Sequence, residues 1–389
     1  MKNHEFSSDE DQNGMAKSSS SYWWKSLQEF DENGNFKAEM NSSHISNLTP
    51  RMRVVREMER LAFVSVEGFD EFRHKLQSYR AGDLWLPVGG IKKEDIDIPP
   101  VITILLTGLN GSGKSSLINL MYSVLGRSGL IPFAQTSGES SSYTTMFLEE
   151  HNVLRSPRSG LCVYDTRGFD HILIDEGLDE VSTWMSDGVR HNQPCYRLGD
   201  DRKFMRSNSA RYVKRRVNCV MVVADLLQIH QAFNSGDFKS IEALKSLFHL
   251  DCIKNLSKFS HSIFPKTTNE NPILILTHGD VLSPKDRIGA RLKICEYLGI
   301  PETSGAYDVA CLTEKGILVE DCDPVTAFAL TEAVYRALLQ SDRSHLPKRK
   351  FVDLIIMFLL WIMSCIATFF AFLAHFFSRF GHHDKRLKM

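Results

Sequence analysis

A glycine-rich stretch between two apolar segments constrains the fold of this chain more than any other feature. It lies within residues 105–121, "LLTGLNGSGKSSLINLM". The segment before the glycines, Val101–Gly108, is a continuous apolar and β-branched run, which is typical of a buried parallel strand. The segment after them places apolar residues on one side of a helix: Leu117, Ile118, Met121 and Leu125. This stretch therefore predicts a strand, a loop and a helix in succession.

The alternation of strands and helices continues along the chain. Further strands are expected at the apolar segments 161–165, 217–225, 271–277 and 307–312, and helices near 284–298 and 324–340. Alternating strands and helices predict an α/β fold with a mainly parallel sheet, in which ligand loops follow the carboxyl ends of the strands.

The glycine-rich loop has a chemical pattern of its own. Gly108-x-x-x-x-Gly113-Lys114-Ser115 fits the P-loop motif in the strand–loop–helix context that the motif requires. Its backbone amides, the helix dipole and the charge of Lys114 favour phosphate, and the Ser115 hydroxyl suits Mg²⁺. The sequence thus predicts binding of a nucleoside triphosphate by a set of loop residues: Asn110, Gly111, Ser112, Gly113, Lys114, Ser115 and Ser116.

A second motif, Asp165-x-x-Gly168, follows the apolar segment "LCVYD". We expect the Asp165 carboxylate to hold Mg²⁺ and the Gly168 amide to contact the γ-phosphate, which makes this loop sensitive to the third phosphate. The next residue is Phe169, so the glutamine that orients water in Ras-like enzymes is absent. Hydrolysis is then expected to be slow, or to need a partner or a second copy of the chain.

A third motif indicates the base. The segment "NPILILTHGD" ends in Thr277-His278-Gly279-Asp280, close to the [NT]-K-x-D guanine signature. An aspartate can accept from the ring N–H and the exocyclic amine of guanine, a pair that adenine does not offer, and an imidazole at 278 can stack where the lysine stem usually lies. The sequence therefore favours GTP over ATP. The alternative is an ATPase or kinase in which Asp225, after the segment "VNCVMVVA", is the acidic residue.

These motifs, in this order, resemble the translation-factor-related class of P-loop GTPases. Within that class the chain is similar to the interferon-induced protein 44 family, over residues 102–279 and through the stretches "GKSSLINLMYSV", "TSGESSSY", "DTRGFD", "VNCVMVVADL" and "LTHGD". Plant immune-associated and plastid-import receptor GTPases are more distant relatives that also allow histidine in the guanine motif. The resemblance implies a GTP-binding domain. It also implies Thr136, in "TSG", as the residue that closes over Mg²⁺ and the γ-phosphate, with Thr144 and Thr145 as alternatives.

The C-terminal region contains 21 uncharged residues, Leu354–Ala374, about 30 Å of helix and enough to cross a bilayer core. We predict a transmembrane helix over 351–377 and a short basic tail over 378–389. Basic residues flank both sides of the segment, so they do not determine its orientation. A GTP site requires the cytosol, which places the domain there, on the endoplasmic reticulum or the outer membrane of an organelle.

The remaining organisation follows from composition. Residues 1–50 are polar and expected to be disordered, apart from Trp23 and Trp24. A helical lead-in over 51–98, with a break near Gly68, precedes a GTPase domain over 99–342. The polar, basic segment 189–216 is interpreted as a surface loop or partner-contact insertion. A net charge of -1 favours no nucleic-acid partner.

Taken together, these features predict a membrane-anchored GTPase that cycles between GTP and GDP states through Mg²⁺-dependent loops, with a possible homodimer. Lys114, Thr136 and Gly168 are the candidate catalytic residues, and Ser115, Asp165 and Thr136 the candidate Mg²⁺ ligands. The alternatives are a nucleotide-binding scaffold without useful turnover and the ATPase or kinase that uses Asp225.

Overall fold

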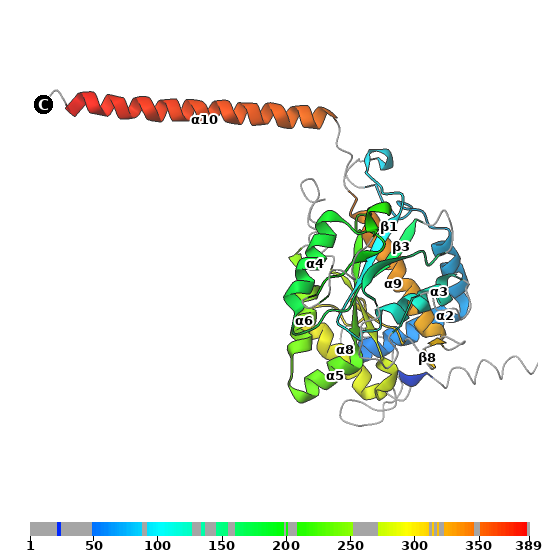
Figure 1. The fold of residues 1–389 in the computed structure, drawn as a ribbon. Helices are drawn as coiled ribbons and strands as arrows, with labels where there is room; N and C mark the ends of the chain where they lie inside the picture. Colours follow the sequence, from blue (N-terminus) through cyan, green and yellow to red (C-terminus); the bar gives the residue numbers. More distant parts are fainter. Residues whose placement is uncertain are drawn as a thin grey trace, which may run out of the picture. The chain divides into compact units, whose positions relative to one another are not determined.

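A seven-stranded sheet lies at the centre of the larger of two units, which comprises residues 1–89 and 98–345 (Figure 1). The smaller unit comprises residues 90–97 and 346–389. The computed structural model describes these parts of the chain: residues 22–24, 49–87, 92–126, 134–136, 145–154, 160–197, 200, 208–251, 271–310, 313–314, 317–318, 323–345 and 351–386. The expected disorder of residues 1–50 and the alternative Thr144 fall largely or wholly outside these ranges.

The sheet has the strand order β4-β2-β3-β1-β5-β6-β7. Its strands are β1 (Ile102–Thr107), β2 (Phe147–His151), β3 (Leu161–Asp165), β4 (Gln193–Pro194), β5 (Cys219–Asp225), β6 (Ile273–Thr277) and β7 (Ala306–Asp308). Strands β3, β1, β5, β6 and β7 are parallel, whereas β2 is antiparallel to both β3 and β4. The mainly parallel sheet predicted from the sequence is confirmed, although β7 is shorter than expected.

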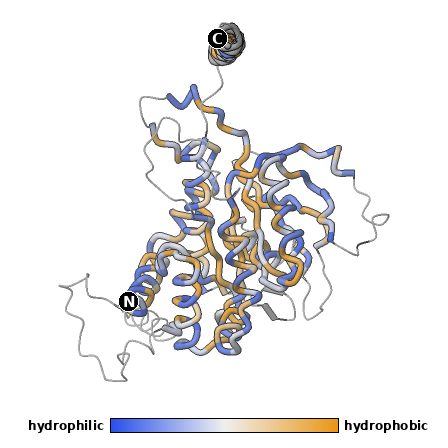
Figure 2. Tube along the Cα trace, turned by 90° about the vertical axis from the view of Figure 1, so that its left-hand side faces the viewer, coloured by the Kyte–Doolittle hydropathy of each residue, from blue (hydrophilic) through white to orange (hydrophobic). Residues whose placement is uncertain are grey.

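Helices cover both faces of the sheet because successive strand residues point to opposite sides. In β1, Leu105 packs into one core, whereas Ile104 and Leu106 pack into the other. The first core includes residues of α4 (Ile174–Asp187), α5 (Leu226–Ser235), α6 (Lys239–Phe248) and α8 (Pro284–Leu298). The second includes residues of α3 (Lys114–Gly126) and α9 (Pro324–Arg343) (Figure 1). Figure 2 shows the central strands as largely hydrophobic.

The lead-in helix α2 (Pro50–Gln77) is continuous, so the expected break at Gly68 is absent. Packing explains this result: α2 lies along α9, and its Phe72 ring contacts the rings of Phe328 and Tyr335, with centroids 5.5 and 5.1 Å apart. A glycine inside a helix costs only about 1 kcal/mol relative to alanine. Tertiary contacts on both sides of Gly68 offset that cost, although the apolar stripe changes phase there.

The connection after α2 is held by a buried carboxylate. Asp342, near the end of α9, is fully buried and accepts hydrogen bonds of 2.9 Å from Tyr79 Oη, the Gly82 amide and the Leu84 amide. Burial and the nearby Asp342 charge raise the pKa of Tyr79, which keeps the phenol protonated and able to donate. Asp342 thereby ties the segment that leads into β1 to the last turns of α9.

The smaller unit contains the C-terminal helix α10 (Phe351–Arg386). Its window Phe358–His375 has a mean hydropathy of 2.0 and no buried residues, and α10 is the one helix in the described part of the chain that is long and apolar enough to cross a membrane. The helix extends beyond the predicted span of 351–377 into the predicted basic tail. Short elements complete the structure: η3 (Lys93–Asp95), η4 (Ser209–Arg211), η6 (Gly279–Val281) and the hairpin of β8 (Thr313–Glu314) with β9 (Ile317–Leu318).

We predict that Asp342→Ala lowers the free energy of unfolding by about 3 kcal/mol, because it leaves two buried donors and one part-buried donor without their acceptor. Urea denaturation of the full chain in detergent, followed by tryptophan fluorescence, measures this change. Asp70→Ala is the matched control: Asp70 has an 85% exposed side chain that pairs with Arg73, and the substitution should cost less than about 0.5 kcal/mol. Equal losses in the two variants would contradict the anchoring role of Asp342.

Candidate nucleotide-binding site

The glycine-rich loop joins the end of β1 to the start of α3 and wraps around the Lys114 side chain. Gly113 has a φ of +81°, a conformation that side chains with a Cβ rarely adopt. Lys114 is 6% exposed, and its Nζ lies 3.3 Å from the Gly108 carbonyl, 3.1 Å from the Leu109 carbonyl and 3.4 Å from Ser112 Oγ. The ammonium is therefore buried among neutral oxygens at the amino end of a helix. This is an arrangement in which phosphate compensates the charge.

Burial lowers the pKa of Lys114 to about 8, while the charge of Asp165 raises it and that of Arg197 lowers it. Two cations thus influence the inside of the loop, and one carboxylate opposes them. The electrostatic balance of the loop favours an anionic ligand.

Hydroxyl and carboxylate oxygens meet at the first turn of α3. Ser115 Oγ donates to Asp165 Oδ2 at 2.6 Å, and Thr145 Oγ1 lies 3.5 Å from the same carboxylate oxygen. Asp165 is 1% exposed, and its Oδ1 is buried with no hydrogen-bond partner among the described residues. Burial raises the pKa of Asp165, against the hydrogen bond from Ser115 and the charge of Lys114. Hard oxygen donors with one carboxylate oxygen left over fit Mg²⁺.

The threonine that contacts this oxygen set in the structure is Thr145, one of the two alternatives to Thr136. Thr145 Oγ1 lies 3.4 Å from Ser115 Oγ, whereas no described contact joins Thr136 to Ser115 or Asp165. Residues 134–136 are attached to α3 instead, because the amide of Asn119 makes two hydrogen bonds to the backbone of Ala134. Thr136 stays a prediction, and the geometry favours Thr145, one of its two alternatives.

The Asp165-x-x-Gly168 loop is joined to the P-loop by backbone hydrogen bonds. The Asn110 amide donates to the Phe169 carbonyl at 2.8 Å, and the Phe169 amide donates to the Gly108 carbonyl at 3.1 Å. A Cβ on Gly168 would lie 2.6 Å from Asn110 Cα and 3.2 Å from Lys114 Nζ. Only glycine permits this approach, which brings the Gly168 backbone close to the lysine.

The guanine-type motif lies on the other side of the P-loop. Thr277 Oγ1 donates to the Ser112 carbonyl at 2.9 Å, and His278 Cε1 is 3.4 Å from the position that a Cβ on Gly113 would take. His278 has a left-handed backbone with a φ of +55°, and Asp280 is exposed in η6. The structure therefore brings three separate motifs together around one loop.

Asp225 takes a role other than the acidic residue of an ATPase. Its side chain accepts from the amides of Leu227 at 2.8 Å and Gln228 at 3.1 Å, which caps α5, and it lies 3.2 Å from His278 Nδ1. That hydrogen bond is the largest cause of a raised His278 pKa, which burial opposes. Asp225 thus faces the base motif, and Asp165 is the acid at Ser115.

Sequence reasoning missed an ion pair behind the base motif. Arg287 and Asp308 form a bidentate pair with both distances 2.7 Å, and both residues are buried. A Cβ on Gly279 would lie 2.7 Å from Arg287 Nε, so the motif backbone rests on this pair. The Trp23 ring lies 4.1 Å from the guanidinium, so this N-terminal residue contacts the rest of the larger unit.

The segment 189–216 is more than a solvated loop. It contributes β4 and η4, and a bridge between Val189 and Arg215 closes it against itself. Cys195 is fully buried, and Arg197 pairs with Glu180 on α4 and lies over the Phe169 ring, 5.1 Å from its centroid. The basic residues of this segment were visible in the sequence, but only the fold shows that the segment lies beside the Gly168 loop.

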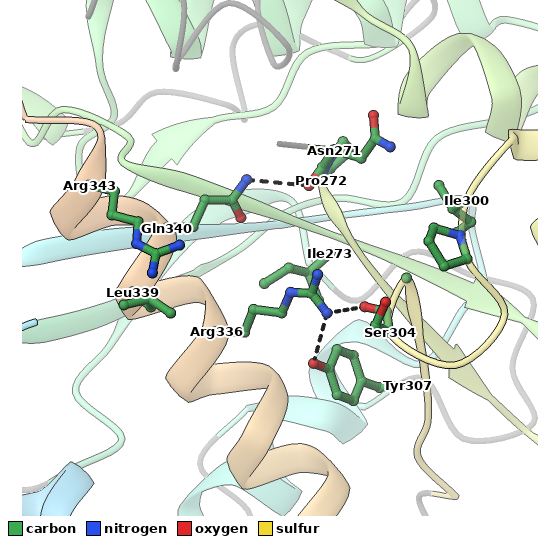
Figure 3. A pocket seen from close by; sticks show the side chains of 12 residues that line it. Asn271, Pro272, Ile273, Ile300, Ser304, Tyr307, Arg336, Leu339, Gln340 and Arg343 are labelled. Carbon is green, nitrogen blue, oxygen red and sulfur yellow. Dashed lines mark hydrogen bonds between the residues drawn. The ribbon is translucent and has the colours of Figure 1, made fainter. Parts of the chain in front are cut away.

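A pocket of about 230 Å³ lies at the opposite edge of the sheet (Figure 3). It is lined by the starts of β6 and β7 and by the end of α9, where Arg336 donates to the Ser304 carbonyl and lies 3.5 Å from Tyr307 Oη. No predicted site residue lines it. The candidate site is therefore the set of loops at the carboxyl ends of the strands, as expected for a parallel sheet.

Comparison with known proteins adds little to this geometry. No family model matches the sequence, and no curated protein is similar to it. Among solved structures, a probable GTP-binding protein engB is 12% identical with a TM-score of 0.32, covering 61% of this chain and 98% of that one. Toc33 from Arabidopsis thaliana, in complex with GDP and Mg²⁺, is 13% identical with a TM-score of 0.30, covering 72% and 96%.

A third similar structure is a complex of the signal recognition particle receptor SRb with GTP and SRX from Chaetomium thermophilum. It is 15% identical with a TM-score of 0.28, and the match covers 56% of this chain and 93% of that one. Sequence identities and TM-scores this low support no conclusion about the chemistry of this chain. The strand order and the loop geometry of the chain itself show an α/β fold with a P-loop at the amino end of α3.

We predict that the His278 ring titrates above its ordinary pKa of 6.5 and that Asp225→Asn lowers this value. Asp280→Asn should lower it less, since that charge is a smaller cause. Because the folded-state pKa is raised, the contribution of His278 to stability is fully present below pH 6.5 and is lost as the pH rises through the folded-state value. An NMR titration of histidine-labelled protein, assigned with His278→Gln, measures the shifts. An unchanged titration in Asp225→Asn would refute the pairing.

Proposed function

We propose that this chain is a membrane-anchored GTP-binding protein that hydrolyses GTP with Mg²⁺. One observation carries the proposal: three motifs that are distant in sequence meet at the amino end of α3. The Ser115 hydroxyl donates to Asp165 at 2.6 Å, and Thr277 donates to the carbonyl of Ser112 at 2.9 Å. The resemblance to translation-factor-related GTPases and the interferon-induced protein 44 family implies the GTP-binding part of this proposal.

The phosphates would lie along the loop from Asn110 to Ser116. The backbone amides of the loop and the Lys114 ammonium bind and orient them. Mg²⁺, when bound, neutralises charge that develops on the β- and γ-phosphates. Ser115 and Asp165 would hold the ion, with Thr145 as third hydroxyl in this geometry and Thr136 as the alternative, and the Gly168 amide would respond to the γ-phosphate.

Guanine recognition would involve the loop after β6. The carboxylate of Asp280 is exposed and accepts no hydrogen bond from the described residues, and the His278 ring is held by Asp225 beside the P-loop. A carboxylate can accept two donors from guanine, whereas adenine has no matching pair. The position of Asp225 also weakens the ATPase or kinase alternative, because its carboxylate caps α5 and contacts His278.

A nucleotide-binding scaffold without useful turnover is the second candidate function. It is favoured by Phe169, which occupies the position of the water-orienting glutamine of Ras-like enzymes. The Phe169 side chain is 1% exposed and packs against α4. The two candidates share a binding site and differ only in the rate of γ-phosphate release. Single-turnover hydrolysis separates them.

The anchor proposal rests on α10. Its described side chains are mostly exposed aromatic and aliphatic residues, which water does not favour and a bilayer does. We propose that residues 351–377 span a membrane of the endoplasmic reticulum or the outer membrane of an organelle, with the domain of residues 99–342 in the cytosol. Attachment to a surface raises the effective concentration of the domains, which supports a homodimer.

The first test uses Lys114→Ala, which should abolish binding of a fluorescent GTP analogue while leaving thermal unfolding and liposome attachment unchanged. The lysine charge serves the phosphates, whereas α3 is held by its own buried face. The exposed Lys285→Ala is the matched control. We expect unlabelled GTP, but not ATP, to displace the fluorescent analogue from the wild-type protein. Equal displacement by ATP would favour the ATPase alternative. Normal affinity for the analogue in Lys114→Ala would contradict the P-loop assignment.

The base motif has its own test. We predict that Asp280→Asn weakens GTP binding about 10- to 100-fold, since hydrogen bonds from guanine to a charged acceptor are lost, and improves binding of xanthosine triphosphate. Xanthine has an oxygen where guanine has its amine, so an amide donor fits it and a carboxylate repels it. Asp70→Asn, on the exposed face of α2, should change neither affinity. If Asp280→Asn leaves both affinities unchanged, the base binds elsewhere.

A further inference from the structure

One arginine beside the candidate site has an unused hydrogen-bond donor. The Arg197 side chain is 7% exposed, and its Nη1 pairs with the Glu180 carboxylate and donates to the Tyr196 carbonyl at 2.7 Å. Its Nη2 is buried and has no hydrogen-bond partner among the described residues. A buried guanidinium donor without an acceptor is costly. A state of the protein in which that donor finds an oxygen would relieve the cost.

The place of Arg197 indicates where such an oxygen would come from. Its guanidinium lies 5.1 Å from the centre of the Phe169 ring, and the Phe169 backbone is hydrogen-bonded to the P-loop at Gly108 and Asn110. The preceding residue, Gly168, approaches Lys114 Nζ, and the charge of Arg197 lowers the pKa of that lysine, although burial is the main cause. Arg197 is therefore a second cation at the end of the loop where the γ-phosphate would bind.

Phe169 provides no polar side chain at the end of the loop where the γ-phosphate would bind. An aromatic ring stands in place of the glutamine that orients water in Ras-like enzymes, and it has no polar atom to offer. Phosphoryl transfer spreads negative charge over the equatorial oxygens of the γ-phosphoryl group. An arginine that donates hydrogen bonds to these oxygens increases the rate about 10³- to 10⁵-fold. The same ring provides a flat surface that holds a guanidinium by cation–π attraction.

We propose that Arg197 is an arginine finger supplied by the same chain, which leaves Glu180 and donates to the γ-phosphoryl oxygens of GTP during hydrolysis. This inference rests on the proposed function. Water forms the new bond to the γ-phosphorus, and the bond from that atom to the β–γ bridging oxygen breaks. The electron pair goes to GDP, and both hydrogens of the water leave with the phosphate as H₂PO₄⁻. Arg197 transfers no proton; it stabilises charge and returns to Glu180.

Glu180 is the partner that holds Arg197 when no γ-phosphate is present. It lies on α4, with a side chain 15% exposed, and burial raises its pKa while Arg197 lowers it. The neighbouring Arg167 differs from Arg197, because both of its terminal nitrogens are engaged by the carboxylate of Asp200. Of these two arginines, Arg197 is therefore the one with a terminal nitrogen that has no acceptor among the described residues.

The experiment compares wild type, Arg197→Ala, Arg197→Lys, Glu180→Gln and the exposed control Arg211→Ala in the full chain on liposomes. Three readouts are needed: affinity for a fluorescent GTP analogue, capture of GDP with aluminium fluoride, which imitates the transferring phosphoryl group, and single-turnover hydrolysis. We expect Arg197→Ala to bind GTP within about 3-fold of wild type, to lose capture and to hydrolyse at least about 10³-fold more slowly.

The other variants sharpen the result. Arg197→Lys keeps charge and packing but lacks the planar fork, so it should also lose capture. Glu180→Gln releases the arginine and should hydrolyse GTP at least as fast as wild type, and Arg211→Ala should match wild type in every readout. Because the finger belongs to the same chain, the rate per molecule should not depend on protein density.

The outcomes are distinct. Suppose that Arg197→Ala, or Arg197→Lys if the alanine variant fails to fold, captures GDP with aluminium fluoride and hydrolyses GTP as wild type does. Arg197 would then be a structural residue, and this inference would be overturned while the proposed function would stand. A wild-type protein that binds GTP without capture or hydrolysis would overturn it in favour of the scaffold. A wild-type protein that does not bind GTP would remove the proposed function itself. A rate that rises with protein density in wild type and Arg197→Ala alike would indicate a second copy instead.

Discussion

Parallel pairing of β1 with β3 on one side and β5 on the other is the constraint on which the candidate site depends. Ile104 is in register with Val163 of β3 and with Cys219 of β5, so the three strands end at the same edge of the sheet. The loops after them can then exchange hydrogen bonds over a few ångströms. A slip of one residue would turn every side chain of β1 to the opposite core and separate these loops. The buried faces of the sheet thus determine the geometry of the chemistry.

Charge at this edge is arranged in two groups. Lys114, Asp165 and Arg197 form one group, where the phosphates of the proposed ligand would bind, and Asp225, His278 and Asp280 form the other, where its base would bind. An isolated buried ion is costly, and in the second group Asp225 is paired with His278 at 3.2 Å. The Arg287–Asp308 ion pair packs against the backbone of Gly279 in the second group's loop, and the Trp23 ring lies over the Arg287 guanidinium. The N-terminal aromatic residues are thereby connected to the loop that would recognise guanine.

Much of the fold and site could be predicted from local patterns. The strands β1, β3, β5 and β6 and the helices α3, α8 and α9 follow from apolar periodicity, and the P-loop and the motifs at Asp165 and Thr277 follow from spacing. Other features had weak local signals: α4, α5 and α6 were not identified individually, and α2 continues through Gly68 because α9 supports it. The sequence favoured Thr136 over Thr144 and Thr145, whereas the distance of each from Ser115 depends on the path of a loop, which no local pattern predicts.

The sequence by itself determined that the chain forms an α/β domain with a P-loop, a guanine-type motif and an apolar C-terminal helix, because those features lie within short windows whose periodicity or spacing has a direct physical meaning. Only the tertiary structure decided which carboxylate faces Ser115, that Asp225 holds His278, and that Arg197 lies on the Phe169 ring. These contacts join residues 28 to 53 positions apart, and no local pattern records them. They arise when the crossovers of the sheet bring separate loops to one edge.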